Sequence, residues 1–525
     1  MELRDDLTIG KLLREAAEKY ADRPALKTRI NTLTYKEFDA SVDVKARRLL
    51  SCGIKHGTHV GVLCETSPRL ITLFYALARI GAVAVMFNTS LGESELTALI
   101  NSSDTTVMIV GDGYKEINFP RVLKSISVNC PKLGLVLYEG RHDSAGFTVV
   151  DSLEPVGEAE LAKAEGKVLP SDTAQILFTS GTTSSPKMVM TSHYSRANCG
   201  RFQAKDLGAT ADDIFMGALP MFHCFSISVN IMAACSVGGC LFLPVSRKTK
   251  VLLSDISDFK CTMLSCVPAL FFAMMRRPDF KEWDMSSVRT GFIGGSGCSH
   301  TQFEEIEKSF GMTLLSSLGQ TEATGGLTTS DLTDPVELRA STVGHFMDEL
   351  EGKIVDPETG KSLPNGTVGE ICVRGYVVMQ GYYNNPEATA KTIDKDGWLH
   401  TGDCGWLGDD GYLRLSGRIK DLIIRGGENI SPAEIEEAAL EDEYIDRCRA
   451  IGVPDHFFGE EVCLCIIPKE GYPGSSTGLR EMLSRRLAAF KVPRYILVFR
   501  SFPEKNTGKV DTIKLREEAC RKLGL

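Results

Sequence analysis

One segment of the chain combines the residue types that hold a phosphate. It reads LFTSGTTSSPK and offers hydroxyl donors, a glycine and a lysine directly after an apolar strand: Thr179, Ser180, Gly181, Thr182, Thr183 and Lys187. Hydroxyls and free backbone N–H groups can converge on phosphate oxygens, and the lysine offsets their charge. The segment lacks the GK[ST] ending of a Walker loop, which excludes a P-loop ATPase. The alternative interpretation is a solvated Ser/Thr turn that binds nothing.

Two further segments place a carboxylate on a turn. The first, SLGQTE, follows an apolar strand and ends in Thr321 and Glu322, a hydroxyl beside a carboxylate that could hold magnesium and a phosphate oxygen. The second, HTGD, ends in Asp403, which suits a ribose diol. Each segment taken alone is also typical of an ordinary surface turn.

The last two segments are basic. GRIKD contains Arg418 and Lys420 and is followed by IIRGGE, whereas PEKNTGKV places Lys509 after a glycine near the C-terminus. Taken alone, Lys509 is typical of a solvated tail lysine. Only the presence of the other segments in the same chain makes Lys509 a candidate catalytic residue.

The elements that must position these segments alternate between strand and helix. Strands of this kind joined by helices predict βαβ units and a largely parallel sheet. We expect strands at 59–64, 82–87, 106–110, 174–178, 261–265, 290–293 and 313–316, and helices at 35–52, 68–80 and 93–102. A buried helix followed by a strand at 240–245 is expected within the apolar stretch 214–246.

From about residue 351 the pattern changes to short β segments separated by Gly, Asn and Asp, and after residue 417 it becomes α+β. The predicted fold is therefore α/β. A large N-terminal domain of parallel βαβ sheets with a small β-barrel-like part covers residues 1–418. A small, mobile α+β C-terminal domain covers residues 419–525.

Composition excludes several classes of protein. The chain has 525 residues, a net charge of −9 and 43% apolar residues, which argues against disorder and against a basic nucleic-acid-binding face. Its 16 cysteines contain no CxxC pair, which disfavours a disulfide scaffold and structural zinc and indicates a reduced, cytoplasmic compartment. No transmembrane segment is expected, because polar residues and glycines interrupt 214–246.

In this order and spacing, the segments resemble the signature set of the adenylate-forming (ANL) superfamily. The resemblance runs from about Leu33 to about Lys514 and includes GAVAV at 81–85, GGSG at 294–297 and IGVPD at 451–455. It implies ATP-dependent adenylation of a carboxylate with release of pyrophosphate, then transfer of the acyl group to a thiol with release of AMP.

The resemblance also implies roles for individual residues. Thr179 to Lys187 would hold the β- and γ-phosphates; Gly295, Ser296, Gly297, Leu318, Gly319 and Gln320 would flank the adenine; Thr321 would contact the α-phosphate and Glu322 would hold Mg²⁺; Asp403 and Arg418 would bind the ribose; and Lys509 would reach the acyl carboxylate. The C-terminal domain would move about Lys420, bringing Gly426 and Gly427 to the thiol tunnel.

The segment LPMFHCF at 219–225 resembles the acyl-CoA synthetase version of the family's fourth motif. His223 would lie by the substrate carboxylate, and the alternative is a core histidine whose hydrogen bonds are satisfied within the protein.

No aspartate is present in this segment to pair with the ammonium of an α-amino acid. We expect no carrier domain after Leu525, which would favour a free-standing ligase that uses CoA. Residues expected to line the acyl pocket are Phe222, His223, Ser226, Gly294, Gly319, Thr324 and Gly325; most are small or apolar, which favours a medium-chain fatty or aryl acid.

Four positions depart from the usual family pattern. Ser184 and Met188 stand where glycines are common, and either costs more than glycine where the backbone needs a positive φ. Leu318 replaces a frequent aromatic residue, and Ser226 replaces a frequent glycine.

None of these four substitutions removes a charged group, so activity with ATP, Mg²⁺ and CoA in a monomer or homodimer is expected. An acyl-carrier protein as acceptor, or a nucleotide-binding member without ligase activity, stays open. A dinucleotide oxidoreductase is disfavoured, because Gly295-x-Gly297 lacks the third glycine.

Overall fold

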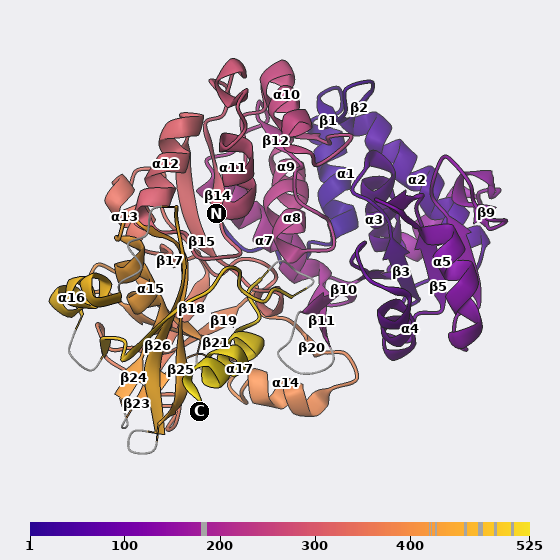
Figure 1. Cartoon of the computed structure of the whole chain (residues 1–525). Coiled ribbons are helices and arrows are strands. Elements are labelled where there is room, and N and C mark those ends of the chain that lie inside the picture. Colours follow the sequence, from indigo (N-terminus) through magenta and orange to yellow (C-terminus); the bar gives the residue numbers. More distant parts are fainter. Residues whose placement is uncertain are drawn as a thin grey trace. The chain divides into compact units, whose positions relative to one another are not determined.

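The computed structural model describes residues 1–179, 186–418, 421, 423–425, 428–455, 459–470, 476–487, 491–505 and 509–525 (Figure 1). The chain forms two units by its internal contacts. The first contains Met1–Gly352 and Val373–His400, and the second contains Lys353–Cys372 and Thr401–Leu525. The domain boundary expected between residues 418 and 419 stays a prediction.

An eight-stranded sheet forms the centre of the first unit. Its strand order is β20 (Gly381–Tyr382), β11 (Lys187–Ser192), β10 (Thr173–Thr179), β4 (Val83–Met86), β3 (His59–Leu63), β5 (Val107–Val110), β8 (Leu135–Tyr138) and β9 (Thr148–Val149). The run from β10 to β9 is parallel, as expected. The other end differs, because β10, β11 and β20 pair in antiparallel fashion.

Two of the expected helices of this unit, α2 (Tyr35–Ser51) and α3 (Pro68–Arg79), begin at side chains that cap them. The structure confirms both of them and α4 (Glu93–Ser102). The Glu37 N–H donates to Thr34 Oγ1 (3.2 Å), and the Thr34 N–H donates to the Glu37 carboxylate (2.8 Å), which forms a capping box. Ser67 caps α3, whose first residue is a proline that has no N–H to leave unpaired.

Two four-stranded sheets and a two-stranded sheet of β6 (Gly113–Tyr114) and β7 (Ile117–Asn118) accompany the large sheet in the first unit. One four-stranded sheet has the order β12 (Ile214–Met216), β13 (Cys240–Phe242), β1 (Pro24–Lys27) and β2 (Thr32–Thr34), and the other has the order β14 (Thr290–Ile293), β15 (Thr313–Leu318), β16 (Thr328–Thr329) and β17 (His345–Phe346). The strand expected at 261–265 forms only isolated bridges, in which Met263 pairs with Phe215 and Thr290. It therefore links β12 to β14 without becoming a strand of its own.

Helical segments fill the apolar stretch between β12 and β13, as predicted. They are α8 (Cys224–Ser226), a π-helical turn over Ile227–Met232 and α9 (Ala233–Val237). No described helix is long and apolar enough to span a membrane. The remaining helices of this unit are α1 (Ile9–Lys19), α5 (Phe119–Ile126), α6 (Glu158–Glu165), α7 (His193–Asp206), α10 (Thr249–Phe259), α11 (Pro268–Met275), α12 (His300–Phe310), α13 (Val336–Ser341) and α14 (Pro386–Thr392).

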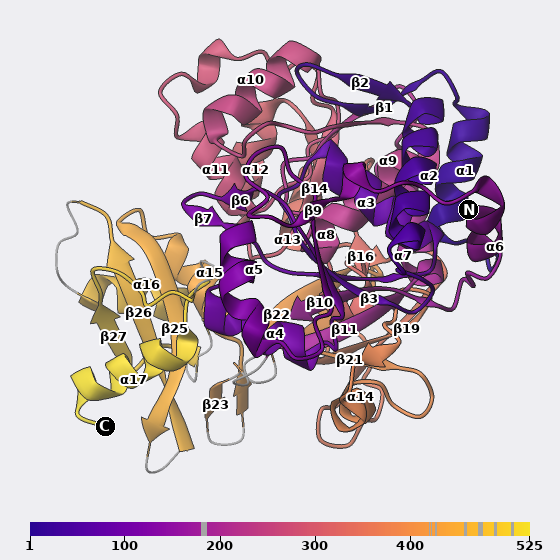
Figure 2. The ribbon, with the colours of Figure 1, turned by 90° about the vertical axis from the view of Figure 1, so that its right-hand side faces the viewer.

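The part of the second unit after residue 417 is α+β, as expected (Figure 2). One sheet of the second unit has the order β18 (Leu350–Val355), β19 (Gly369–Gly375), β21 (Leu399–Leu407) and β22 (Leu413–Arg418). The other has the order β24 (Glu428–Ile430), β23 (Ile423–Arg425), β26 (Gly459–Pro468) and β25 (Ile445–Asp455), with β27 (Tyr495–Val498) parallel to β26. Its helices are α15 (Pro432–Leu440), α16 (Ser476–Arg486) and α17 (Thr512–Leu523).

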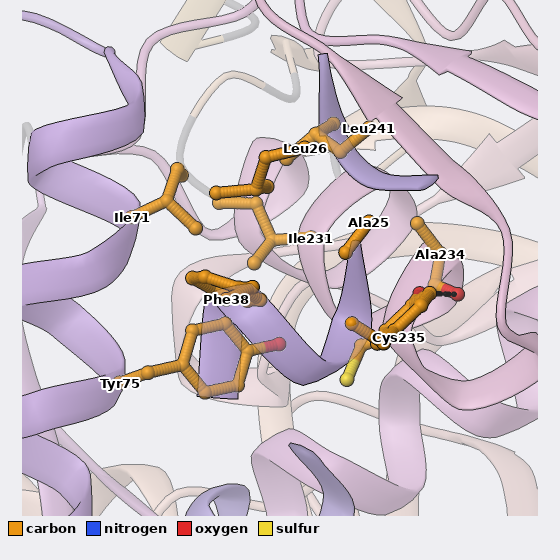
Figure 3. A pocket seen from close by; sticks show the side chains of 10 residues that line it. Ala25, Leu26, Phe38, Ile71, Tyr75, Ile231, Ala234, Cys235 and Leu241 are labelled. Carbon is orange, nitrogen blue, oxygen red and sulfur yellow. Dashed lines mark hydrogen bonds between the residues drawn. The ribbon is translucent and has the colours of Figure 1, made fainter. Parts of the chain in front are cut away.

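A small cavity lies in the core of the first unit, where Phe38, Ile71 and Tyr75 surround it (Figure 3). Its volume is about 10 Å³, which is close to the least space that a single water needs. Tyr35 closes one side by donating its hydroxyl to the carbonyl oxygens of Ala234 (3.1 Å) and Gly239 (2.7 Å). The cavity is a packing defect and is too small for an organic acid.

One buried carboxyl group makes stability depend on pH. Asp206 is the last residue of α7, where the helix dipole opposes a negative charge. One of its carboxylate oxygens is buried without a partner among the described residues. Burial raises the pKa of Asp206 to about 7. Since the unfolded pKa is about 3.9, the unfolded chain loses this proton first, and the free energy of unfolding falls as pH rises from about 4 to about 7.

We therefore predict that Asp206→Asn stabilises the protein above pH 7 by about 1–2 kcal/mol and not below about pH 4. The measurement is the thermal unfolding midpoint across this pH range. Asp212→Asn serves as the control, because Asp212 is exposed. An Asp206→Asn variant whose midpoint follows the wild-type pH profile would contradict the prediction.

Candidate functional site

The carboxyl ends of β14 and β15 bring two of the sequence segments together. The strands are parallel neighbours, with Ile293 opposite Ser316, so their following turns meet at one edge of the sheet. Gly294 is buried there, and a Cβ on it would lie 3.1 Å from the Ser317 carbonyl oxygen and 3.9 Å from the Phe225 ring. The GGSG segment, the SLGQTE segment and the LPMFHCF segment are therefore adjacent. Gly295, Ser296 and Gly297 are exposed beyond Gly294.

The turn after β15 is tight. Thr324 has φ of 57° and Gly325 has φ of 96°, and a Cβ on Gly319 would lie 2.5 Å from the Gly325 carbonyl oxygen. Leu318 ends β15 half-buried. The amide nitrogen of Gln320 is buried and has no hydrogen-bond partner among the described residues, so it is a donor suited to a heterocyclic base.

A buried cation that the sequence analysis missed fixes this turn. Arg196 on α7 is fully buried, and its Nη1 donates to the Thr324 carbonyl oxygen (2.8 Å) and to Ser228 Oγ (2.7 Å), with a longer contact to the Cys224 carbonyl oxygen (3.5 Å). Thr324 Oγ1 in turn donates to the Val377 carbonyl oxygen (2.6 Å). Burial lowers the pKa of Arg196. Arginine at this position thus ties the residues after His223 to the residues after Glu322.

Glu322 and Lys187 meet at a shared tyrosine, Tyr382. The Tyr382 hydroxyl donates to Glu322 Oε1 (2.9 Å), and Lys187 Nζ lies 4.6 Å from the Tyr382 ring centroid, within cation–π range. Lys187 begins β11 opposite Thr179, the last residue of β10. The two ends of the phosphate segment and the carboxylate of the SLGQTE segment are therefore close to one another.

The donor set at Glu322 fits a magnesium ion. Its carboxylate and the hydroxyl of the adjacent, half-buried Thr321 are both oxygen ligands, which Mg²⁺ prefers. The Tyr382 hydroxyl contacts Oε1, and burial, reinforced by the nearby Glu322, raises the pKa of that phenol, so it stays a neutral donor.

The LPMFHCF segment places an exposed histidine beside the turn. His223 precedes α8, and its ring centroid lies 4.6 Å from that of Phe222. Cys224 Sγ lies 3.8 Å from Thr321 Oγ1. Ser226 Oγ donates to the Leu219 carbonyl oxygen (3.0 Å), so a hydroxyl in place of the frequent glycine is satisfied within its own segment.

The structure removes one expected source of strain in the phosphate segment. Met188 lies in β11 opposite Phe178 and is not among the residues with positive φ. A side chain therefore costs nothing there. Ser180, Gly181, Thr182, Thr183 and Ser184 lie outside the described residues.

The second unit carries the other predicted residues. Asp403 is buried on β21 directly opposite Arg418 on β22, and its N–H donates to Thr401 Oγ1 (3.1 Å). Lys509 is exposed, and its carbonyl oxygen accepts from the Lys505 N–H (2.8 Å). Lys420, Gly426, Gly427 and the side chain of Arg418 lie outside the described part of the chain.

We predict that Gly319→Ala lowers the free energy of unfolding by about 1–3 kcal/mol, because its Cβ would meet backbone that the Arg196 contacts hold in place. Gly297→Ala is the matched control, since a Cβ at that position has nothing within 4 Å. Chemical denaturation without ligand measures both variants. Equal stability of the two would show that the turn relaxes freely.

Comparison with known proteins agrees with this geometry. The model of the AMP-binding enzyme family matches residues 13–383, and that of the AMP-binding enzyme C-terminal domain matches residues 434–509. The acyl-CoA ligase sidI of Aspergillus fumigatus is 32% identical over 542 residues, which cover 98% of this chain and 91% of the relative. The mitochondrial medium-chain acyl-CoA ligase ACSF2 of Danio rerio is 31% identical over 540 residues, covering 99% and 89%.

A solved structure shares the whole fold. The anthranilate CoA ligase AuaEII, in complex with anthranoyl-AMP, superposes with a TM-score of 0.87 at 25% identity, and all of both chains is covered. With the motifs adjacent as described, the chain belongs to the AMP-binding enzyme family, in the acyl-CoA synthetase branch of the ANL superfamily, and is an AMP-forming acid–thiol ligase.

Proposed function

We propose that the protein activates a medium-chain fatty acid or an aryl or other bulky apolar acid as its acyl-adenylate and then transfers the acyl group to CoA. In the first step a carboxylate oxygen attacks the α-phosphorus of ATP and pyrophosphate leaves. In the second step the thiol sulfur bonds to the acyl carbonyl carbon, the thiol proton is lost and AMP leaves. Each step exchanges one bond at the reacting atom and needs no oxidant.

The observation that carries this proposal is the convergence of Lys187 and Glu322 on Tyr382, with the Thr321 hydroxyl next to Glu322 in the chain. The reaction brings a carboxylate to a triphosphate, two anions that repel. Cations and hydroxyl donors fixed before the reaction supply positioning and charge stabilisation, which are the main sources of catalysis for such a transfer. Magnesium held at Glu322 would neutralise phosphate charge when bound.

The acid is inferred from the residues expected around it. Phe222 is aromatic, and Gly294 and Gly325 are small and packed against neighbouring backbone. One relative is named a medium-chain ligase and one solved neighbour holds anthranoyl-AMP. These names support an apolar chain or ring of that size.

The proposal also assigns roles to residues of the second unit. Asp403 and Arg418 would bind the ribose, Lys420 would be the hinge, and Gly426 and Gly427 would border the thiol tunnel. Arg418 and Asp403 are direct cross-strand neighbours, which supports a shared ligand for them. The cytoplasmic compartment and the monomeric or dimeric state stay predictions.

We predict that pyrophosphate release depends on an added carboxylic acid and that C6–C12 fatty acids or aryl acids exceed acetate by about 10-fold or more, since each buried methylene adds about 0.8 kcal/mol. A pyrophosphate-release assay over an acid panel, with and without CoA, provides the measurement. Thioester formed only with an acyl-carrier protein would replace CoA as acceptor. No release with any acid would favour a nucleotide-binding member without ligase activity.

We also predict that Lys509→Ala slows adenylation by about 100-fold or more, because an ammonium is lost where the carboxylate and triphosphate meet. Thioester formation from preformed acyl-adenylate should change by less than about threefold. Lys514→Ala is the control, since Lys514 is an exposed lysine nearby in sequence. Normal adenylation by Lys509→Ala would remove that lysine from the mechanism.

A further inference from the structure

Tyr382 is the residue that Lys187 and Glu322 have in common, and the family motifs used above do not include it. Glu322 contacts its hydroxyl and Lys187 contacts its ring. Tyr382 itself is only 5% exposed. A buried, neutral side chain thus lies against a cation and an anion at once.

The tyrosine separates charges that would otherwise attract each other. Among the carboxylates that the structure describes, none forms an ion pair with Lys187, and Glu322 forms none with a described cation. A direct Lys–Glu pair would have to break before triphosphate and metal could bind, because each charge would already have a partner. The cation–π and hydroxyl contacts satisfy the two side chains while leaving both charges uncompensated.

Backbone contacts fix Tyr382 in this place. It pairs with Val189 of β11, the strand that Lys187 begins. Its N–H donates to Thr389 Oγ1 (2.9 Å), and the Met379 N–H donates to the Glu322 carbonyl oxygen (2.9 Å). The same short segment therefore holds both the backbone and the carboxylate of Glu322.

We propose that Tyr382 is a positioning residue for the metal–nucleotide complex: its hydroxyl aligns the Glu322 carboxylate and its ring keeps Lys187 from neutralising that carboxylate. The inference rests on the proposed function, because it assumes that Glu322 holds magnesium and Lys187 holds phosphate. In this role Tyr382 would contact neither the reacting atoms nor the bound nucleotide.

The experiment is calorimetric titration of ATP into the protein without any acid, once with Mg²⁺ and once with EDTA. Tyr382→Phe keeps the ring under Lys187 and removes only the hydroxyl. We expect it to weaken Mg-ATP binding about 10-fold, as for loss of a hydrogen bond to a charged group, and to leave metal-free ATP unchanged. Tyr383→Phe is the matched control, since the neighbouring Tyr383 hydroxyl donates to Asp104 instead (2.8 Å); it should bind as the wild type does.

A Glu322→Gln background separates positioning from a loosened fold. If Tyr382 acts through Glu322, Tyr382→Phe should add no further loss of Mg-ATP binding in that background. Equal loss in both backgrounds, equal loss with and without metal, or wild-type binding by Tyr382→Phe would each overturn the inference. Failure of the wild type to bind Mg-ATP would instead refute the proposed function.

Discussion

The site in the first unit depends on the register of β11 between β10 and β20. That register sets Lys187 opposite Thr179 on one side and Val189 opposite Tyr382 on the other. Because side chains alternate across a sheet, a slip by one residue would turn Lys187 to the opposite face and away from Tyr382. The lysine, the tyrosine and Glu322 would then no longer meet, whatever the conformation of the intervening segment.

A second constraint holds the turn that carries Glu322. Arg196 is a fully buried cation whose hydrogen-bond acceptors are neutral, namely Ser228 and the carbonyl oxygens of Thr324 and Cys224. Burying a charge without a counter-ion is costly, and two of its nitrogens lack partners among the described residues. In return the arginine fixes a left-handed residue, Thr324, two positions after Glu322. The register of β11 and the buried Arg196 therefore both fix the position of the Glu322 carboxylate.

Much of this could be predicted from sequence because the signals were local. The Thr34–Glu37 capping box and the proline at the start of α3 mark helix ends within a few residues, and the segments after β14 and β15 follow from two apolar strands. The roles of Tyr382 and Arg196 arise from pairings between residues far apart in the chain, which no local pattern encodes. The strand predicted at 261–265 is wrong for a related reason. The segment has a strand-like composition and lies between β12 and β14, but it pairs with them only through single bridges.

The most direct test of adenylation follows the oxygen atoms. With a carboxylic acid labelled with ¹⁸O at both carboxylate oxygens, attack on the α-phosphorus must carry one labelled oxygen into AMP, because the acyl–oxygen bond breaks in the second step. We expect AMP with one ¹⁸O per thioester formed. Unlabelled AMP, or ADP as the nucleotide product, would contradict it.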